Sequence, residues 1–533
     1  MSPLTNHKVD VIIIGGGLAG LGLAYQMKSG SPELKIIVIE KRQFPLPRAI
    51  AKVGESTVEI GSRYLSHHLG LKEHLTKDHL KKFGIRMFFG KPDNDFSMQD
   101  ELGASQVFGI PTYQIDRGDI ENHLAKTIRS MGVTLYDNAD ITTFELGKNK
   151  HNVTFETNNV NSPEKIQFES PWLVDASGRR AFIKQKLNLA KTNDHNANAA
   201  WFRIDKRIEI DSWSNSDDWR SRCTPESRRW LSTNHLVGPG YWVWVIPLAS
   251  GVTSIGIVMD DQTLHESGIE SQETAMEWLH KHQKRCAEAI EGASFLDFVL
   301  LRDYSYDCKQ LMSDDGWAIT GEAGLFADPF YSPGSDFIAI NNNFISELIQ
   351  SNLKGEDTRF QRALYEKLYF SIYNNTLSLY VEQYGGFGDR QMMGLKLLWD
   401  YSYYWGVLSL LFFRNALTDL NLMRKLNPIL QNAQDLNKEV QAIFRQRAKK
   451  RQALPNRGVF MDQYQIPCLQ HFNQVLMSEN IKNTEADLKN NISMLEKIAA
   501  HTKDMLSESA NEQISSEERE LLGNYREKIL AEA

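Results

Sequence analysis

The stretch that most constrains the fold is residues 9–40, VDVIIIGGGLAGLGLAYQMKSGSPELKIIVIE. Residues 11–14 form an apolar, β-branched run that suits a buried parallel strand, and Gly15, Gly17 and Gly20 follow in the G-x-G-x-x-G pattern. The first glycine permits a tight turn, the second lets backbone approach a pyrophosphate, and the third brings the helix close to the strand. This stretch therefore predicts a strand, turn, helix and strand that bind a dinucleotide.

The same unit supplies an anion site and a ribose acceptor. The start of the predicted helix, with Leu18 and Ala19, offers unpaired N–H groups to phosphates. Glu40 follows a second apolar run, residues 36–39, where a carboxylate can accept hydrogen bonds from an adenosine ribose. On these residues alone, the unit suits NAD and FAD equally.

Composition narrows the class of protein. A chain of 533 residues is too long for one ordinary core, so we expect two or more domains. A formal net charge of −7, with 24% charged residues, gives no electrostatic case for nucleic-acid binding. The four cysteines are widely spread without CxxC pairing, and no histidine group has further ligands at metal-binding spacing. We therefore expect free thiols and no metal site.

Two features concern location. No apolar leader precedes the first predicted strand, and the longest apolar run, residues 397–413, contains Asp400 and is short for a bilayer span. We expect a cytoplasmic protein without a transmembrane segment, in which this run is a buried or interfacial helix.

The remaining chain changes character along its length. Residues 153–156 and 166–169 predict a hairpin, and residues 199–311 alternate strand-like runs with polar loops. Beyond about residue 357 almost everything is predicted to be helical. Residues 481–533 form a polar, amphipathic tail that is either packed or directed toward a partner.

Two further stretches indicate a longer cofactor site. Residues 173–179, LVDASGR, predict a strand that ends near adenine-side phosphates. Residues 317–334 predict a strand and an acidic loop, after which a helix N-terminus faces a flavin ring or an anion. Two arginines complete the pyrophosphate and ring environment, with a surface ion pair as the alternative for each. The candidates are Asp175, Gly321, Glu322, Asp328, Pro329, Arg48 and Arg117.

In this order, the motifs resemble those of FAD-dependent monooxygenases of the aromatic-hydroxylase type. Within that superfamily, the chain resembles the flavin-dependent halogenases. Residues 242–247, WVWVIP, match the W-x-W-x-I-P signature, and residues 54–56 match the GES or GEA run. Lys82 lies close to the place of the family's catalytic lysine, and residues 399–409 are similar to a segment of halogenases that act on pyrrole or phenol-like rings. The likeness spans roughly residues 8–410.

The resemblance implies an α/β fold with a Rossmann-like FAD-binding domain, an interleaved β-sheet substrate domain and a helical C-terminal region. We expect residues 1–198 and 312–356 to form the FAD-binding domain. Residues 199–311 are then the β-rich substrate domain, and residues 357–533 the helical C-terminal region.

The resemblance also implies the chemistry. FADH2 and oxygen oxidise chloride or bromide to hypohalous acid, which a lysine holds or converts to a haloamine and delivers to an electron-rich aromatic ring. Lysine suits this role because it is a compact donor whose pKa falls on burial. Lys82 is the first candidate and Lys81 and Lys52 are alternatives. The structural alternative is a solvated basic face formed by Lys77, Lys81 and Lys82.

Three other candidates come from the family motifs. Trp242 and Trp244 share one face of a strand, where they either separate the substrate from the flavin or are ordinary core aromatics. Glu55 is a catalytic candidate and Ser56 a cofactor-binding candidate, because both belong to the GES run.

The flavin-side loop departs from the family pattern in two ways. Tyr331 stands before Ser332, where tryptophan halogenases carry a glutamate, which favours a phenol, pyrrole or carrier-tethered ring over free tryptophan. Pro333 has no N–H to offer a halide, so Gly334 and Ser335 are the predicted donors. Without those donors, the protein is expected to act as a hydroxylase or oxidase.

The expected partners are a small aromatic substrate, free or tethered to a carrier protein, and a separate flavin reductase. Two alternatives remain at this point. One is a flavin monooxygenase or dehydrogenase on the same fold that does not halogenate. The other is a non-catalytic flavin-binding scaffold whose helical tail docks a carrier protein.

Overall fold

The computed structural model describes residues 6–90, 95–158, 164–478, 481–507 and 515–530, and it divides into two compact units. The first unit comprises Met1–Lys77, Ile115–Asn193 and Ser305–Tyr373. The second comprises Asp78–Gln114, Asp194–Tyr304 and Asn374–Ala533. The sheet expected over residues 199–311 and the helical region thus fall in one unit, together with residues 78–114.

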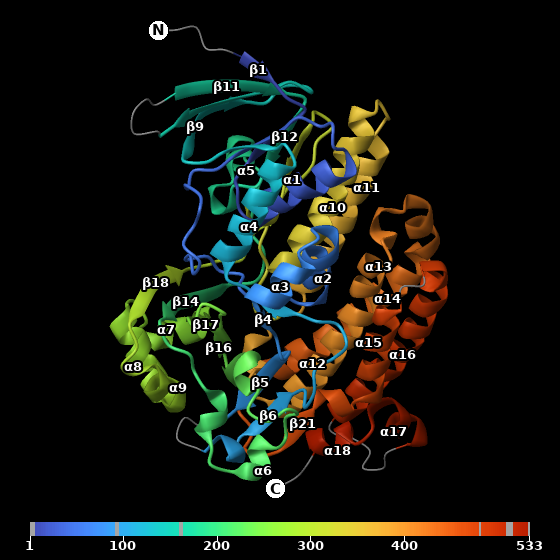
Figure 1. The fold of residues 1–533 in the computed structure, drawn as a ribbon. Helices are drawn as coiled ribbons and strands as arrows, with labels where there is room; N and C mark the ends of the chain where they lie inside the picture. The colour runs from blue at the N-terminus through green and yellow to red at the C-terminus, as the bar shows by residue number, and fades with distance from the viewer. Residues whose placement is uncertain (1–5, 91–94, 159–163, 479–480, 508–514, 531–533) are drawn as a thin grey trace. The chain divides into compact units, whose positions relative to one another are not determined.

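A five-stranded parallel sheet forms the centre of the first unit, in the order β20-β12-β2-β3-β8. Figure 1 labels β12 of this sheet and the helices α1, α4 and α10 of the same unit. The predicted strand, turn, helix and strand of residues 9–40 are confirmed as β2, α1 and β3. Helix α1 packs against both α4 and α10. The bounds are β2 Val11–Ile14, α1 Leu18–Gly30, β3 Ile36–Ile39, α4 Arg117–Ser130, β8 Thr134–Tyr136, β12 Trp172–Asp175, β20 Trp317–Ile319 and α10 Gly334–Leu353.

A second sheet of this unit has the order β1-β11-β10-β9. The predicted hairpin is confirmed, since β10 and β11 pair antiparallel. Its strands are β1 Asn6–Lys8, β9 Ala139–Glu145, β10 His151–Thr157 and β11 Glu164–Ser170. The other elements are α2 Glu59–Arg63, a π-helical turn Tyr64–His68, α3 Lys72–Asp78, α5 Phe182–Lys186, the pair β13 Ala190–Lys191 and β19 Asp307–Cys308, and α11 Arg359–Leu377.

The second unit contains an eight-stranded mixed sheet in the order β18-β14-β17-β16-β15-β5-β6-β21. Strands β5, β6 and β21 come from outside residues 199–311 and extend the sheet at one side. A short antiparallel pair, β4 Leu80–Lys81 with β7 Tyr113–Gln114, lies beside it. The strands are β5 Ile85–Phe89, β6 Asp100–Gly103, β14 Ala197–Ile204, β15 Thr233–Gly238, β16 Tyr241–Pro247, β17 Thr253–Asp260, β18 Phe295–Leu301 and β21 Phe460–Asp462.

The two faces of this sheet have different neighbours because side chains alternate along a strand. One face belongs to a buried apolar cluster that includes Val243, Ile257 and Phe202, together with residues of α8 and α9. The opposite face carries Trp242 and Trp244. The helices near the sheet are α6 Asp217–Arg220, α7 Asp261–Ser267, α8 Gln272–His282 and α9 Lys284–Ile290.

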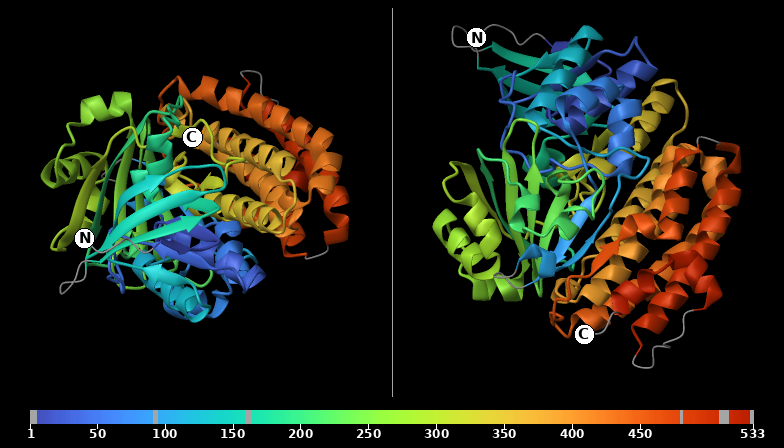
Figure 2. Two further views of the ribbon diagram at one scale, coloured as in Figure 1. Left: turned by 90° about the horizontal axis from the view of Figure 1, so that it is seen from above. Right: turned by 60° about the horizontal axis from the view of Figure 1, so that its bottom comes forward.

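The rest of the second unit is helical, as the sequence predicts, apart from β21. Helices α12, α14 and α16 pack against one another (Figure 2). The tail is packed, because the Tyr525 hydroxyl donates to the Gly394 carbonyl at 3.1 Å and Arg390 Nη1 donates to the Ile529 carbonyl at 3.0 Å. The helices are α12 Arg390–Tyr403, α13 Leu410–Phe413, α14 Leu420–Ala448, α15 Pro467–Met477, α16 Thr484–Met505, α17 Ser516–Leu522 and α18 Tyr525–Leu530.

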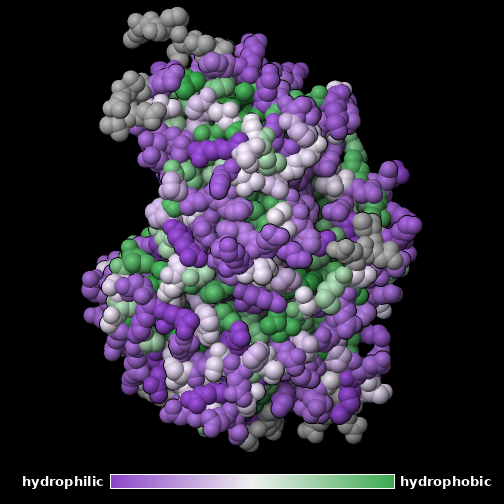
Figure 3. Space-filling view, in the orientation of Figure 1, coloured by the Kyte–Doolittle hydropathy of each residue, from purple (hydrophilic) through white to green (hydrophobic). Residues whose placement is uncertain are grey.

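Residues 397–413 are mostly buried in α12, α13 and the π-helical turn between them, which confirms the expected buried helix. Within the described part of the chain, no helix is both long enough and apolar enough to cross a membrane. Hydrophilic side chains cover most of the face seen in Figure 3, with hydrophobic ones in scattered patches. The four cysteines are free and buried, as expected.

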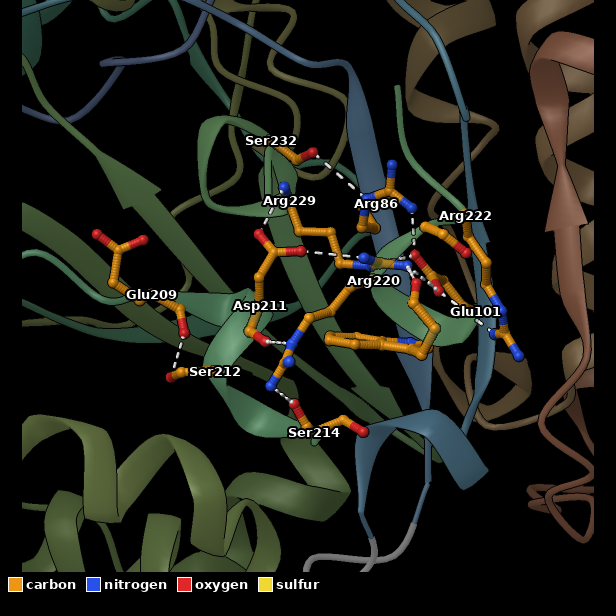
Figure 4. A network of polar contacts seen from close by, with 12 residues as sticks. Arg86, Glu101, Glu209, Asp211, Ser212, Ser214, Arg220, Arg222, Arg229 and Ser232 are labelled. Carbon is orange, nitrogen blue, oxygen red and sulfur yellow. Dashed lines mark hydrogen bonds and ion pairs between the residues drawn. The ribbon is translucent and has the colours of Figure 1, made fainter. Parts of the chain in front are cut away.

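A buried ion-pair network joins the strands of the eight-stranded sheet to the segment after β14 (Figure 4). Arg86 on β5 and Arg229 both pair with Glu101 on β6, and Arg229 Nη1 also lies 3.0 Å from Asp211 Oδ1. Arg222 Nη1 lies 3.6 Å from the second carboxylate oxygen of Glu101. Burial alone would raise the pKa of Glu101, but the charges of Arg86 and Arg229 outweigh it and hold that pKa below its usual value.

Glu101→Gln should destabilise the protein strongly. The substitution keeps the side-chain shape but removes the carboxylate charge that Arg86 pairs with and leaves Arg229 to Asp211, so we expect the free energy of unfolding to fall by about 3–5 kcal/mol. Denaturant unfolding measures this. Glu277→Gln, at an exposed position of α8, is the matched control and should change stability by less than about 0.5 kcal/mol. Equal stability of the two variants would contradict the role of the network.

Candidate functional site

The glycine turn of the first unit is built on close backbone approaches. Gly15 has φ +107°, and a Cβ at this position would lie 2.3 Å from the carbonyl oxygen of Ala176. A Cβ at Gly20 would lie 2.0 Å from the carbonyl oxygen of Gly15. Both positions therefore require glycine, because any side chain would collide with backbone.

Gly17 serves a different purpose. It precedes the first residue of α1, and the nearest atom to a Cβ there would be Glu121 Oε1 at 3.9 Å. Leu18 and Ala19 follow in the first turn of the helix, where N–H groups have no intrahelical partner. The open space at Gly17 and the helix N-terminus together fit a pyrophosphate.

Glu40 lies at the end of β3 beside this turn. Its Oε2 accepts a hydrogen bond from Gly16 N at 2.7 Å, and its Oε1 accepts one from Arg42 N at 3.0 Å. The carboxylate is therefore held against the glycine turn, and its remaining lone pairs fit a ribose hydroxyl.

A charged cluster lies on the other side of Gly17. Arg117 Nη2 donates to Glu121 Oε1 at 2.7 Å, and Lys52 pairs with the other oxygen of this buried carboxylate. Burial raises the pKa of Glu121, but the charges of Arg117 and Lys52 outweigh it and keep that pKa below its usual value. Sequence reasoning missed Glu121, although its i,i+4 spacing from Arg117 on α4 was a usable signal.

The GES segment and Arg48 lie near this cluster. Arg117 Nη1 donates to Val53 O at 2.7 Å and would lie 2.9 Å from a Cβ on Gly54, which has φ +94°. Glu55 and Ser56 are buried, and the Glu55 carbonyl accepts from Ile115 N at 2.7 Å. Arg48 is half-exposed, and its Nε lies 3.7 Å from Asp116 Oδ2. This contact is an ion pair, the alternative role that the sequence left open for Arg48.

The second stretch forms a compact turn next to Gly15. The Asp175 carboxylate is fully buried and accepts hydrogen bonds from Ser177 N at 3.0 Å, Ser177 Oγ at 2.5 Å and Ile183 N at 2.8 Å. Burial raises the pKa of this carboxyl group. Asp175 therefore shapes the turn that approaches Gly15, whereas its side chain is directed into the turn itself.

The third stretch contacts both earlier ones. Gly321 has φ +62°, and a Cβ there would lie 3.0 Å from Ala19 Cβ. Glu322 Oε2 lies 3.3 Å from Arg179 Nε in a partly exposed ion pair. Asp328 is buried and accepts from Phe330 N at 2.8 Å, and Pro329 follows it in the same loop. The three separated stretches thus meet around one end of the parallel sheet.

The loop before α10 is the predicted halide site. Pro333 precedes the helix, and its carbonyl accepts from Phe337 N at 3.0 Å. A Cβ on Gly334 would have nothing within 4 Å, so the helix begins beside open space. Among the described residues, the buried Ser335 Oγ has no hydrogen-bond partner. Free N–H groups at Gly334 and Ser335 are expected here, since they lie in the first turn of a helix.

The two signature tryptophans lie in the second unit on the sheet face opposite the apolar cluster. Trp242 and Trp244 are buried, with ring centroids 5.6 Å apart. The Trp242 ring lies 4.7 Å from that of His235 on β15. We call the set formed by Trp242, Trp244, His235 and Trp201 on β14 the tryptophan face.

Lys82 lies three residues before β5, whose Met87 pairs with His235. Only 2% of the residue is exposed, whereas Lys77 and Lys81 are exposed to solvent. Burial, and to a smaller extent the charge of Lys82, lower the pKa of the His235 imidazole to about 3, so this ring is neutral beside the lysine. The solvated basic face considered from the sequence therefore does not include Lys82. Lys52, the other alternative, is engaged by Glu121 in the first unit.

The units divide the predicted site residues into two groups. The tryptophans, Lys82 and its alternative Lys81 belong to the second unit, and the other candidates belong to the first. The first group comprises Gly15, Gly17, Leu18, Ala19, Gly20, Glu40, Arg48, Glu55, Ser56, Arg117, Asp175, Gly321, Glu322, Asp328, Pro329, Gly334 and Ser335.

Comparison with known proteins agrees with this geometry. Residues 8–267 match the family model of an FAD binding domain. The flavin-dependent halogenase chlA of Dictyostelium discoideum is 28% identical over 435 residues, which are 76% of this chain and 70% of that protein. The 1H-pyrrole-2-carbonyl-(peptidyl-carrier protein) chlorinase of Pseudomonas fluorescens is 27% identical over 361 residues, which are 64% of this chain and 75% of that protein.

A solved structure shows the same fold. The crystal structure of halogenase PltM in complex with phloroglucinol and FAD matches with a TM-score of 0.69 and 16% identity, over 92% of this chain and 96% of that one. The open turn at Gly17 and the acceptor at Glu40 are compatible with the pyrophosphate and a ribose of FAD.

Gly17→Ala should weaken FAD binding without unfolding the protein. The added methyl group meets no protein atom closer than 3.9 Å, but it occupies the space that fits the pyrophosphate. We expect the dissociation constant of FAD, measured by flavin fluorescence, to rise at least about tenfold, with an unchanged unfolding midpoint of the apoprotein.

Gly15→Ala is the contrasting variant and should lower the unfolding midpoint, because its methyl group collides with the Ala176 carbonyl. A Gly17→Ala chain that binds FAD as tightly as the parent would contradict the placement of the pyrophosphate.

Proposed function

The chain belongs to the flavin-dependent halogenases, oxidoreductases that use FAD and a halide, and from this premise we propose that it halogenates an electron-rich aromatic ring by way of Lys82. The observation that carries the proposal is the burial of Lys82 in the unit that also contains the signature tryptophans, while its neighbours Lys77 and Lys81 are exposed. A lysine is rarely buried in this way unless its position has a use.

The halide is proposed to bind at the start of α10. The N–H groups of Gly334 and Ser335 lie at the positive end of a 20-residue helix, where an anion is stabilised by the helix dipole and by hydrogen bonds. Pro333 contributes no N–H, so this site has one donor fewer than an all-amide loop. When FAD is bound and reduced, its reaction with oxygen would supply the oxidising equivalents that convert halide to hypohalous acid.

Lys82 then takes the halogen from hypohalous acid. The uncharged amine attacks the halogen, so that an N–halogen bond forms as the O–halogen bond breaks, and the hydroxide takes the amine's proton and leaves as water. The aromatic ring next attacks this halogen and loses one proton, which restores the amine. Lys82 suits this sequence because only 2% of the residue is exposed, so it is shielded from water.

The remaining catalytic candidates have supporting roles in the proposal. Trp242 and Trp244 form a bulky, buried wall that keeps the organic substrate from receiving oxygen directly from the flavin. Glu55, buried in the GES segment beside Arg117, helps to order the flavin side of the site. The tryptophan wall is thus the feature that separates halogenation from hydroxylation.

The proposed substrate is a phenol or pyrrole, free or bound to a carrier protein. Two observations support this class. Tyr331 stands where tryptophan halogenases carry a glutamate, and a relative of this chain is a chlorinase of pyrrole-2-carbonyl groups on a peptidyl-carrier protein. A separate flavin reductase is proposed to supply FADH2, as the resemblance to flavin-dependent halogenases implies.

Lys82→Ala should abolish halogenation while flavin binding persists. With FAD, a flavin reductase, bromide and a panel of phenols and pyrroles, the parent chain should give products with the bromine isotope pair in their mass spectra. The variant should give at least about a hundredfold less, because the group that receives the halogen is missing. Lys81→Ala is the matched control and should behave like the parent.

Two outcomes contradict this assignment. If Lys82→Ala brominates at the parent rate, Lys82 does not carry the halogen. If the parent gives oxygenated products that contain no bromine, the proposed reaction is wrong.

Pro333→Ala tests the halide site by adding a donor. The backbone at this position, φ −78° and ψ −2°, is open to alanine, and the new N–H lies next to the two proposed donors. We expect the KM for bromide to fall by about threefold to tenfold, the effect of one hydrogen bond to an anion, with the same affinity for FAD. An unchanged or higher KM for bromide would place the halide elsewhere.

A further inference from the structure

Gly256 on β17 determines how closely the tryptophan face is packed. Strand β17 lies between β14 and β16, and their register places Gly256 directly between Trp201 on one side and Trp244 on the other. A Cβ on Gly256 would lie 2.3 Å from ring atoms of Trp244. The indole of Trp244 therefore lies over the glycine, in space that no other residue would leave free.

Ser254 holds the same two indoles by hydrogen bonds. It lies two residues before Gly256 and therefore points to the same face of the sheet. Its Oγ accepts a hydrogen bond from Trp201 Nε1 at 2.9 Å and another from Trp244 Nε1 at 3.2 Å. An indole N–H is a donor only, and a buried one needs an acceptor, so this fully buried hydroxyl satisfies two rings from two strands at once.

The contacts continue from these rings to the strand that follows Lys82. Trp244 lies 5.6 Å from Trp242 between ring centroids, Trp242 lies 4.7 Å from His235, and His235 pairs with Met87 on β5, which begins three residues after Lys82. The orientation of Trp244 therefore limits where the next two rings can lie, and with them the surroundings of the lysine. Trp201 has no place in the signature motif, yet it shares its acceptor with a signature residue.

We infer that Ser254 is a positioning residue for halogen transfer, because its hydroxyl sets the orientation of Trp244 and Trp201 and through them the packing around Lys82. The inference rests on the proposed roles of Lys82 and of the tryptophan wall. It also adds Trp201 to the wall that Trp242 and Trp244 are proposed to form. The hydroxyl, rather than the size of the side chain, is the feature that the inference requires.

The contact itself is tested by NMR on protein labelled with 15N at the tryptophan indoles. Ser254→Ala should shift two indole N–H signals and speed their exchange with water, and Trp201→Phe and Trp244→Phe should identify those two signals by removing them. Ser254→Thr keeps the hydroxyl and should leave both signals protected. If no indole signal shifts in Ser254→Ala, the shared hydrogen bonds are absent and the inference fails.

The role is tested by the brominated product formed per flavin oxidised. Ser254→Ala should lower this yield about fivefold to tenfold, the factor that one or two neutral hydrogen bonds provide, and the lost oxidant should appear as hydrogen peroxide or oxygenated product. Ser254→Thr should retain most of the yield. FAD affinity should be unchanged in both variants, because the flavin-binding residues belong to the first unit.

Three outcomes separate the possibilities. An unchanged yield in Ser254→Ala, with both indole signals shifted, overturns the positioning role. An equal loss of yield in Ser254→Thr and Ser254→Ala, with the indole signals of the Thr variant unshifted, also overturns it. If the parent chain forms no brominated product at all, the proposed function fails and the role of Ser254 in it fails with it.

Discussion

The burial of Lys82 is a constraint that the rest of the second unit has to satisfy. Taking an ammonium or amine group out of water costs free energy that other interactions must offset. Lys82 N and Phe83 N donate to the carbonyls of Thr112 and Leu231 at 2.8 and 3.0 Å, and Arg86, on the strand that follows, belongs to the buried ion-pair network. The buried ion pair of Arg86 with Glu101 thus anchors β5, which begins three residues after Lys82.

Each unit also contains a close approach that only glycine permits. In the first unit, Gly15 meets the carbonyl of Ala176, which brings the glycine turn and the second strand-end turn together at the cofactor site. In the second unit, Gly256 lies under the indole of Trp244, which lets a large ring lie flat on the sheet. The first approach joins two turns next to the open space at Gly17, and the second allows Trp244 to contact the backbone of β17.

Local signals account for what the sequence could predict. The strand, glycine turn and helix of the first unit were predictable because their pattern lies within residues 9–40, and the signature residues Trp242 and Trp244 lie on one strand. The addition of β5, β6 and β21 to the second sheet was not predictable, because strand pairing joins residues far apart in sequence.

The same limit applies to the site. Sequence reasoning placed Asp175 near phosphates, but its carboxylate is used inside its own turn, which depends on the local backbone. The link between Trp201 and Trp244 through Ser254 depends on the register of three strands, and a slip of one residue would place these side chains on opposite faces. The burial of Lys82 next to exposed Lys81 likewise follows from folding rather than from composition.

The central claim, that the protein itself holds the halogen at Lys82, is tested most directly by a chase experiment. The enzyme is given reduced FAD, oxygen and bromide without an aromatic substrate, free hypobromous acid is removed by rapid gel filtration, and a phenol is added to the protein fraction. We predict brominated phenol in an amount close to that of the enzyme; its absence after gel filtration would contradict the claim.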